Sequence, residues 1–136
     1  NIIEADKMVS LSKENQRFFE LFIQLMRLSY QRKVKELKSW SVDVAGLGRE
    51  QIMRFLTYIQ RLIRENFIYN LSVSELNYLN KEEAQFSQNF AKFITENNVI
   101  KLIDVFNKAL TDISGNANAK IVLYDMSIKV ILLLKS

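Results

Sequence analysis

Apolar residues recur at intervals of three and four along most of the chain. Between residues 18 and 30 two such series interleave, which predicts a helix with a wide buried side. Ser12, followed by KENQ, is predicted to cap the start of this helix. The pattern continues through Trp40, with a break expected near Lys33, and DVAGLG at residues 43–48 is predicted to end it.

Four further stretches show the same spacing. Helices are predicted at residues 49–70, 81–94 and 97–113, and the closing stretch at 114–136 is a fourth candidate. The connection at residues 70–80 is expected to hold one turn capped by Ser74. The sequence has no Pro and three Gly, so it lacks the turn signals of an all-β domain. The expected fold is therefore all-α, a single bundle of about five helices.

The closing stretch is open to four interpretations. Ile121 to Leu134 is too short for a bilayer span, which needs about 20 apolar residues, and it carries Asp125 and Lys129. Residues 124–130 alternate like a strand, but a lone strand would have no partner in a helical domain. As a helix, the stretch is apolar nearly all round and gains an i,i+4 ion pair from Asp125 and Lys129. Such a helix is expected either at the centre of the bundle or against another subunit.

The absence of two residue types narrows the chemistry. The chain has no Cys and no His, which excludes disulfides, Ser-His and Cys-His pairs and ordinary zinc sites. GNANAK resembles a phosphate loop, but its spacing, its missing second Gly and Ile121 do not fit that motif. Glu82 and Glu83 stand at a helix start, where they are expected to complement the helix dipole rather than act as an acid and base. We therefore expect no catalytic residue, no metal ligand and no cofactor in this chain.

Positive charge is concentrated in the first half of the chain. The net charge is +4, and all seven Arg lie between Arg17 and Arg64. Arg54, Arg61 and Arg64 project from one predicted helix with glutamates nearby, which favours a solvated helix face or the rim of a protein interface over a nucleic-acid surface. The many Phe residues have the spacing of a core. Trp40 and Tyr69 lie near helix ends, so they are alternative anchors for a partner.

Five segments together resemble a known family. They are FIQLMRLSY, ELKSW, GREQIMRFLTYIQRLIRENFIYN, EEAQFSQNFAKFI and NANAKIVLYDMSIKVILLL. In their order and spacing they resemble the C-terminal domain of the delta-prime subunit of the bacterial DNA polymerase III clamp loader. The last segment is the most specific, since an Asn-x-Lys turn at Asn118 and Lys120 leads into an apolar helix with one acidic residue, Asp125. The resemblance extends from about Phe18 to Leu134.

The resemblance implies a function in DNA replication. It implies that residues 13–136 form a helical collar domain and that residues 1–12 lead in from an AAA+ module outside this chain. Collars of five subunits pack into a ring that holds the loader together while it places the sliding clamp on primed DNA. The delta-prime subunit generally does not hydrolyse ATP. The implied partners are the gamma/tau and delta subunits, DNA is contacted only through the assembled loader, and the expected location is cytoplasmic without membrane contact.

Several assignments follow as expectations. Non-enzymatic assembly is the first interpretation, with a collar of the related gamma/tau subunit as the nearest alternative. A stand-alone helical module that binds nucleic acid or protein is a second interpretation, and an enzyme using carboxylates or Tyr is a third. The residues predicted to lie at subunit interfaces are Trp40, Arg61, Arg64, Tyr124, Asp125 and Ile128.

Overall fold

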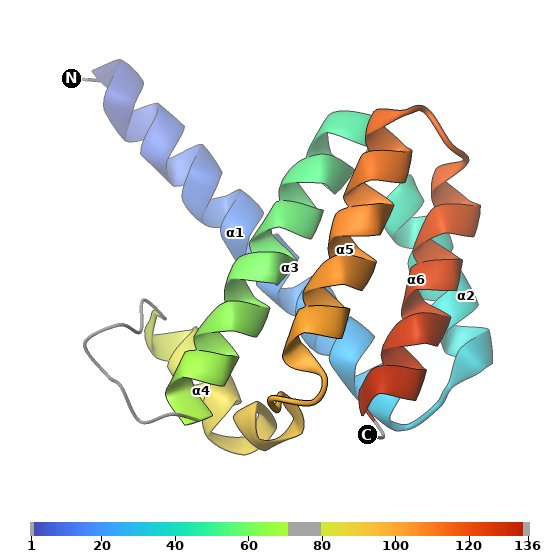
Figure 1. The fold of residues 1–136 in the computed structure, drawn as a ribbon. Coiled ribbons are helices and arrows are strands. Elements are labelled where there is room, and N and C mark those ends of the chain that lie inside the picture. The colour runs from blue at the N-terminus through green and yellow to red at the C-terminus, as the bar shows by residue number, and fades with distance from the viewer. Residues whose placement is uncertain (1, 71–79, 135–136) are drawn as a thin grey trace.

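The chain folds into a bundle of antiparallel helices. The computed structural model describes the backbone at residues 2–70 and 80–134 and the side chains at 13–68 and 80–134. Within those ranges there is no strand. The helices are α1 (Ile2–Tyr30), α2 (Val34–Ala45), α3 (Arg49–Asn70), α4 (Lys81–Phe90), the 3-10 helix η2 (Ala91–Phe93), α5 (Val99–Ser114) and α6 (Ala119–Leu134). The predicted all-α fold is thus confirmed (Figure 1).

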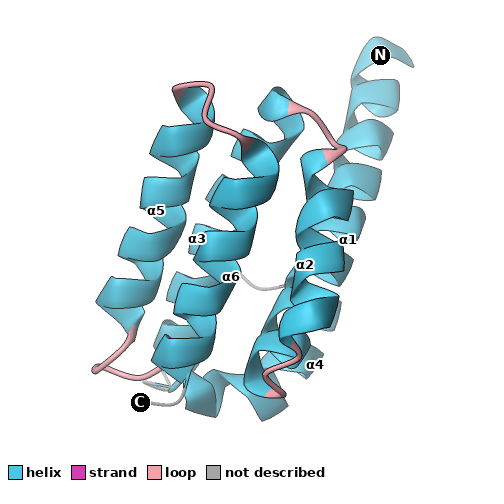
Figure 2. Ribbon diagram, turned by 90° about the vertical axis from the view of Figure 1, so that its right-hand side faces the viewer, coloured by secondary structure: helices cyan, strands magenta, loops and turns pink. Residues whose placement is uncertain are grey.

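The helices pack around one apolar core. α3 packs mainly on α5, and α6 packs on α2, α5 and α1. Figure 2 shows α6 on the outside of the bundle, between α5 and α2. Phe22, Phe55 and Phe106 are fully buried at the centre. Since these residues belong to the series spaced by three and four, the sequence pattern correctly identified the core.

The start of α1 differs from the prediction. Ser12 was expected to cap the helix, but α1 begins at Ile2 and passes through Ser12, so that prediction is wrong. The first turns of α1 extend beyond the rest of the bundle (Figure 1). No residue between Ile2 and Ser12 is Pro or Gly, and the backbone therefore continues in helical form.

The predicted break near Lys33 is confirmed, and its geometry is specific. Arg32 has φ 58° and occupies the left-handed region. The N–H of Lys33 donates to Leu28 O at 2.9 Å, and the N–H of Arg32 donates to Ser29 O at 3.1 Å. This pair of bonds is the Schellman motif, which ends α1 and turns the chain into α2. An Arg therefore fills a position that usually holds Gly.

The turn between α5 and α6 uses the same device. Asn116, with φ 66°, takes the left-handed position, whereas Gly115 does not. The Arg49 guanidinium donates to Asn116 Oδ1 at 2.7 Å and so ties the turn to the start of α3. Asn118 Oδ1 accepts from the N–H of Ile121 at 3.2 Å, which caps α6. The Asn-rich stretch is therefore a helix stop followed by a helix start.

The α-helix α4 is shorter than expected. The predicted helix at 81–94 is α-helical only to Phe90 and then tightens into η2. Asn98 is buried behind this turn, where its amide donates to Phe93 O at 2.8 Å and to Leu133 O at 3.2 Å. Asn98 therefore joins η2 to the end of α6. The turn expected at Ser74 lies outside the described residues.

Candidate functional site

A groove runs along the outer side of α3, between α1 and α5. Its volume is about 870 Å³, and Phe18, Met53 and Leu110 supply the apolar part of its lining. Three arginines of α3 also line it, and we call it the arginine groove. They are Arg54, Arg61 and Arg64.

A second groove lies between α1 and α4. The volume of this second groove is about 530 Å³, compared with about 870 Å³ for the arginine groove. Both are open to solvent along their length, so each is a surface groove rather than an enclosed cavity.

Each of the first two arginines of the arginine groove has a carboxylate partner. Arg54 Nε donates to Glu14 Oε1 at 2.7 Å and its Nη2 donates to Glu14 Oε2 at 3.2 Å, a two-pronged pair that joins α3 to α1. The hydrogen bond from Arg54 lowers the pKa of Glu14 below its usual value, although partial burial acts in the opposite direction. Arg61 Nη2 donates to Glu83 Oε2 at 2.9 Å. Arg64 is exposed, and among the described residues it forms no ion pair.

Glu83 lies at the centre of a buried polar cluster. It is 2% exposed and accepts from the Tyr58 hydroxyl at 2.6 Å, from Arg61 and from the N–H of Asn80 at 3.1 Å. Asn80 Oδ1 in turn accepts from the N–H of Glu83 at 2.8 Å, which completes a capping box at the start of α4. The Arg61 guanidinium also lies 5.1 Å from the centre of the Tyr58 ring. The cluster therefore fixes α4 against α3.

The environment of Tyr58 changes its acidity. Burial raises the pKa of Tyr58 well above its ordinary value, and the hydrogen bond to Glu83 raises it further. The hydroxyl thus stays protonated and serves as a donor to the carboxylate. From the sequence, Glu83 was expected only to complement the helix dipole, and its partners Tyr58 and Arg61 were not predicted. The signal present in the sequence was the spacing of Asn80 and Glu83, which is that of a capping box.

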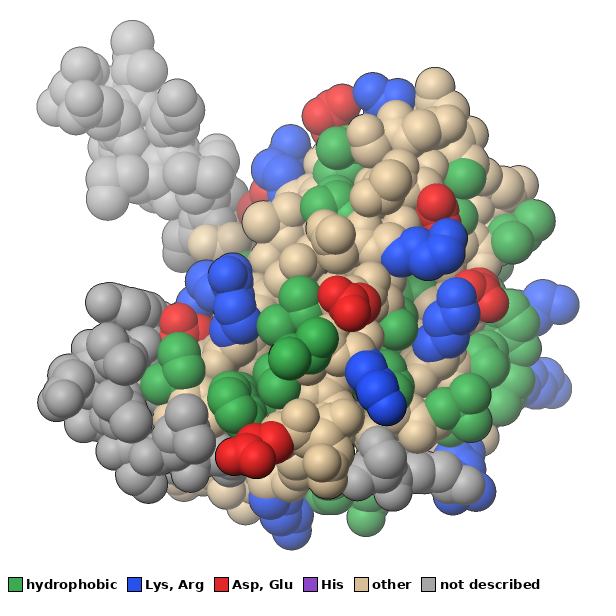
Figure 3. Space-filling model, viewed as in Figure 1, with side chains coloured by type: hydrophobic (Ala, Val, Ile, Leu, Met, Phe, Trp, Pro, Cys, Tyr) green, Lys and Arg blue, Asp and Glu red, His purple; other side chains and the backbone are tan. Residues whose placement is uncertain are grey.

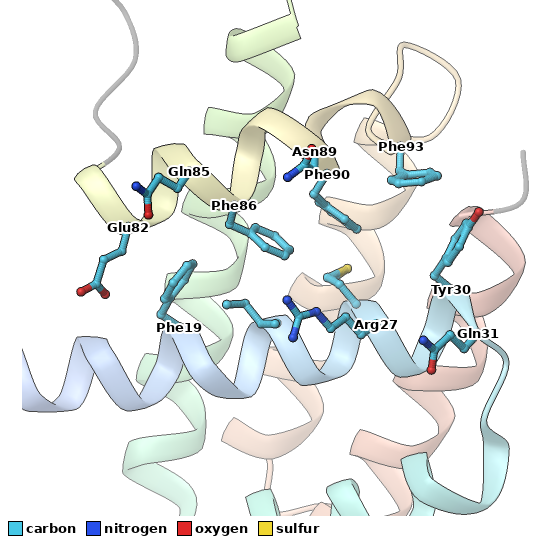
Figure 4. Close-up of a pocket in the computed structure, with 12 residues that line it drawn as sticks. Phe19, Arg27, Tyr30, Gln31, Glu82, Gln85, Phe86, Asn89, Phe90 and Phe93 are labelled. Atoms are coloured by element: carbon cyan, nitrogen blue, oxygen red, sulfur yellow. The ribbon is translucent and has the colours of Figure 1, made fainter.

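The groove between α1 and α4 is lined by aromatic rings. Figure 4 shows Phe86 and Phe90 extending from α4 toward α1, and Phe19 extending from α1 toward α4. The Phe86 and Phe90 rings stack with centres 5.0 Å apart, and Phe19 meets Phe86 edge-on at 6.0 Å. Polar side chains stand around the rings. This arrangement suits the burial of an apolar group.

A third surface is apolar and lies on α2 and α6. Ile121 and Leu132 of α6 are 68% and 65% exposed. Tyr124 and Ile128 are half-buried on the side of α6 that faces α2. On α2, Trp40 faces α1, and the half-exposed Val34 and Val42 lie on the side toward α6. α2 packs along α6, and we call the exposed and half-buried apolar residues of these two helices the α2/α6 face; Ile121 also lines the shallow groove between α5 and α6. The face consists of Val34, Val42, Ile121, Tyr124, Ile128 and Leu132.

Apolar side chains of this region are visible on the molecular surface. Figure 3 shows green atoms gathered toward the lower right of the molecule, where α6 lies in the same view of Figure 1. Large exposed apolar patches on a water-exposed surface are typical of interaction sites. The α2/α6 face is therefore a candidate site for another protein.

The six predicted interface residues lie in three different places. Arg61 and Arg64 share the arginine groove, and Tyr124 and Ile128 share the α2/α6 face. Asp125 is 62% exposed beside that face and pairs with Lys129 at 2.8 Å, as the sequence predicted. Trp40 is only 3% exposed, and its Nε1 donates to Leu21 O at 3.1 Å, so its indole is a core group that joins α2 to α1. The side chain of Tyr69 lies outside the described residues.

Among the side chains described at residues 13–68 and 80–134, no three acidic, His or Cys groups gather as a metal site would require. Of the helices within residues 2–70 and 80–134, none has both the length and the apolar character needed to cross a bilayer.

Comparisons with known proteins add no assignment. No protein-family model, curated protein or solved structure matches this chain.

Proposed function

We propose that this chain is a non-catalytic assembly domain, the collar of the delta-prime subunit of a bacterial DNA polymerase III clamp loader. In this role it holds the five-subunit loader together through contacts with the gamma/tau and delta subunits, in the cytoplasm, during loading of the sliding clamp. It meets DNA only through the assembled loader. The proposal rests on the resemblance of five sequence segments and on the character of the α2/α6 face.

The observation that carries the proposal is the exposed apolar surface of α6. A helix that is apolar nearly all round is normally buried on most sides. α6 buries one side against α1, α2 and α5, but Ile121 and Leu132 remain more than half exposed. Burial of one such side chain contributes about 1.5–3 kcal/mol, so a partner that covers this side of α6 gains a substantial free energy.

The distribution of the surfaces also supports a place in a ring. A subunit in a closed ring of unlike neighbours uses two different surfaces, one for each neighbour. The α2/α6 face and the arginine groove are built on different helices, and α3 and α6 are not a major packing pair. The two surfaces are therefore available to two partners.

The second interpretation, a module that binds nucleic acid, has less support. Phosphate backbones are bound by uncompensated positive charge. In the arginine groove, three arginines stand among two glutamates, Glu14 and Glu50, which leaves a formal charge of +1. Arg54 already has its carboxylate partner in Glu14. The charge of the groove thus favours protein over nucleic acid.

A direct test is the assembly of the domain with its proposed partners. The domain is mixed with purified delta and gamma/tau subunits, and the mass of each eluting species is measured by light scattering. We expect a species that contains this domain together with the other subunits. Separate elution of all components, each shown to be folded by circular dichroism, contradicts the proposal.

A further inference from the structure

The arginine groove has features of a site for a helix from another protein. Its outward positions on α3 are residues 50, 54, 57, 61 and 64, which follow one another at alternating steps of four and three. Positions with this 3.5-residue repeat form a straight line along a helix, and a second helix packs along such a line only where apolar side chains lie within reach, as Phe18, Met53 and Leu110 do here. α1 and α5 contribute the two walls of the groove.

The chemistry of the groove specifies what such a helix must carry. Met53 and Leu110 are half-buried and Phe18 is buried below them, so the floor accepts aliphatic side chains. Arg64 is exposed at one end and forms no ion pair within the described part of the chain. A planar guanidinium binds a carboxylate through two parallel hydrogen bonds. A complementary helix therefore needs aliphatic residues along one side and a carboxylate opposite Arg64.

We propose that the arginine groove binds an amphipathic, acidic helix of a partner protein, with an aliphatic side chain over Met53 and Leu110 and a carboxylate on Arg64. This site lies apart from the α2/α6 face, on which the proposed function depends. The groove proposal can therefore fail while assembly through the α2/α6 face, which is tested separately, still holds.

Nucleic acid is the competing ligand and is less suited to this groove. A polyanion needs several free cations in a row, whereas the Arg54 side chain is held by Glu14 and the Arg61 side chain by Glu83. Glu50, 74% exposed at one end of this line of positions on α3, repels phosphate. The apolar floor contributes nothing to the binding of a phosphate backbone but buries an aliphatic side chain.

The test uses the isolated domain and a synthetic helix. The probe is a peptide of about 20 residues, long enough to be helical, with Leu at heptad spacing and Glu on both sides of the Leu seam. Binding is followed by chemical-shift changes of the labelled domain. We expect changes at α3 and at the lining residues of α1 and α5. The absence of such changes at millimolar peptide overturns the proposal.

Reversing the charge of Arg64 and of the peptide tests the proposed contact more specifically. Arg64→Glu is expected to weaken binding of the peptide about tenfold. A peptide with Lys in place of Glu is expected to restore the affinity for this variant. Lys38→Glu, the same charge change on the exposed side of α2, is the matched control and is expected to leave binding unchanged. Equal weakening by both variants means attraction to overall charge and overturns the proposal.

A third experiment measures the binding of single-stranded DNA of about 20 nucleotides to the domain under the same conditions. We expect it to bind more weakly than the acidic peptide at about 0.15 M salt. Tighter binding of DNA, falling steeply with added salt, assigns the groove to nucleic acid and overturns the proposal.

Discussion

Single residues decide how the surfaces of this domain are held in place. Glu83 is a buried carboxylate whose oxygens accept from Tyr58, Arg61 and Asn80. A buried charge is tolerated only when it is paired and hydrogen-bonded. Because these donors come from α3 and from the residue before α4, the charge of one side chain determines the position of a whole helix.

Tyr58→Phe tests this cluster. The variant removes the hydroxyl donor to a charged acceptor, and we expect a loss of about 2 kcal/mol in the free energy of unfolding near neutral pH. The folded pKa of Tyr58 is raised, so its stabilising effect is complete below the ordinary value of 10.0 and is lost as the pH rises above it. The difference between wild type and variant should therefore narrow above about pH 10.

The measurement is urea denaturation from about pH 8 to about pH 11. Tyr30→Phe is the control, since Tyr30 is 58% exposed and no described hydrogen bond joins its hydroxyl to Glu83. A difference between wild type and Tyr58→Phe that stays constant across this range contradicts the account of the cluster.

At the scale of the element, individual residues determine where each helix ends and which of its sides is buried. α1 ends because Arg32 takes a left-handed conformation, and α6 starts because Asn118 caps its first turn. The sides of α6 differ in burial, since Met126 and Val130 face the core while Asp125 faces solvent. These causes can be tested one at a time.

Arg32→Gly should stabilise the domain. A side chain at positive φ costs about 1–2 kcal/mol, and Gly removes this strain but adds entropy to the unfolded chain. The net gain is expected to be about 0.5–1 kcal/mol in the free energy of unfolding. Lys33→Gly is the control: Lys33 has φ −85°, so Gly relieves no strain there and should destabilise. Equal effects of the two substitutions would show that the left-handed turn carries no strain.

Asp125→Leu tests which side of α6 is exposed. Asp125 and Lys129 form a surface ion pair, which is worth at most about 0.5 kcal/mol, so the variant should remain nearly as stable as wild type. Ser127→Leu makes a comparable change on the buried side, where Ser127 is 0% exposed, and overpacking there should cost about 1–3 kcal/mol. Thermal unfolding of both variants distinguishes the two sides, and a large loss for Asp125→Leu contradicts the orientation of α6.

Much of the fold follows from local sequence, and much of the site does not. The helices and the buried Phe residues follow from apolar spacing, and the cap at Asn118 follows from residue type. The burial of Glu83 does not, because its donors Tyr58 and Arg61 lie 25 and 22 residues away in sequence. Trp40 near a helix end was an expected partner anchor, yet α1 supplies its acceptor at Leu21. The spacing of apolar residues gives no information about contacts between distant segments of the chain.

At the scale of the whole molecule, the domain has surfaces on different sides and a core between them. The α2/α6 face is apolar, the arginine groove is mixed in charge, and the groove between α1 and α4 is aromatic. A domain built for assembly needs surfaces of this kind, since each contact must distinguish one neighbour from another. The central claim is that the α2/α6 face is covered by a neighbouring subunit.

The most direct test of that claim is the mass, by light scattering, of the domain mixed with the delta and gamma/tau subunits, compared for wild type, Leu132→Glu and Gln88→Glu. Leu132 lies on the α2/α6 face, whereas Gln88 is exposed on α4 and receives the same charge. The account predicts that wild type and Gln88→Glu enter the complex and that Leu132→Glu enters it much more weakly. A complex of unchanged mass and affinity with Leu132→Glu, or no complex with folded wild type, would contradict it.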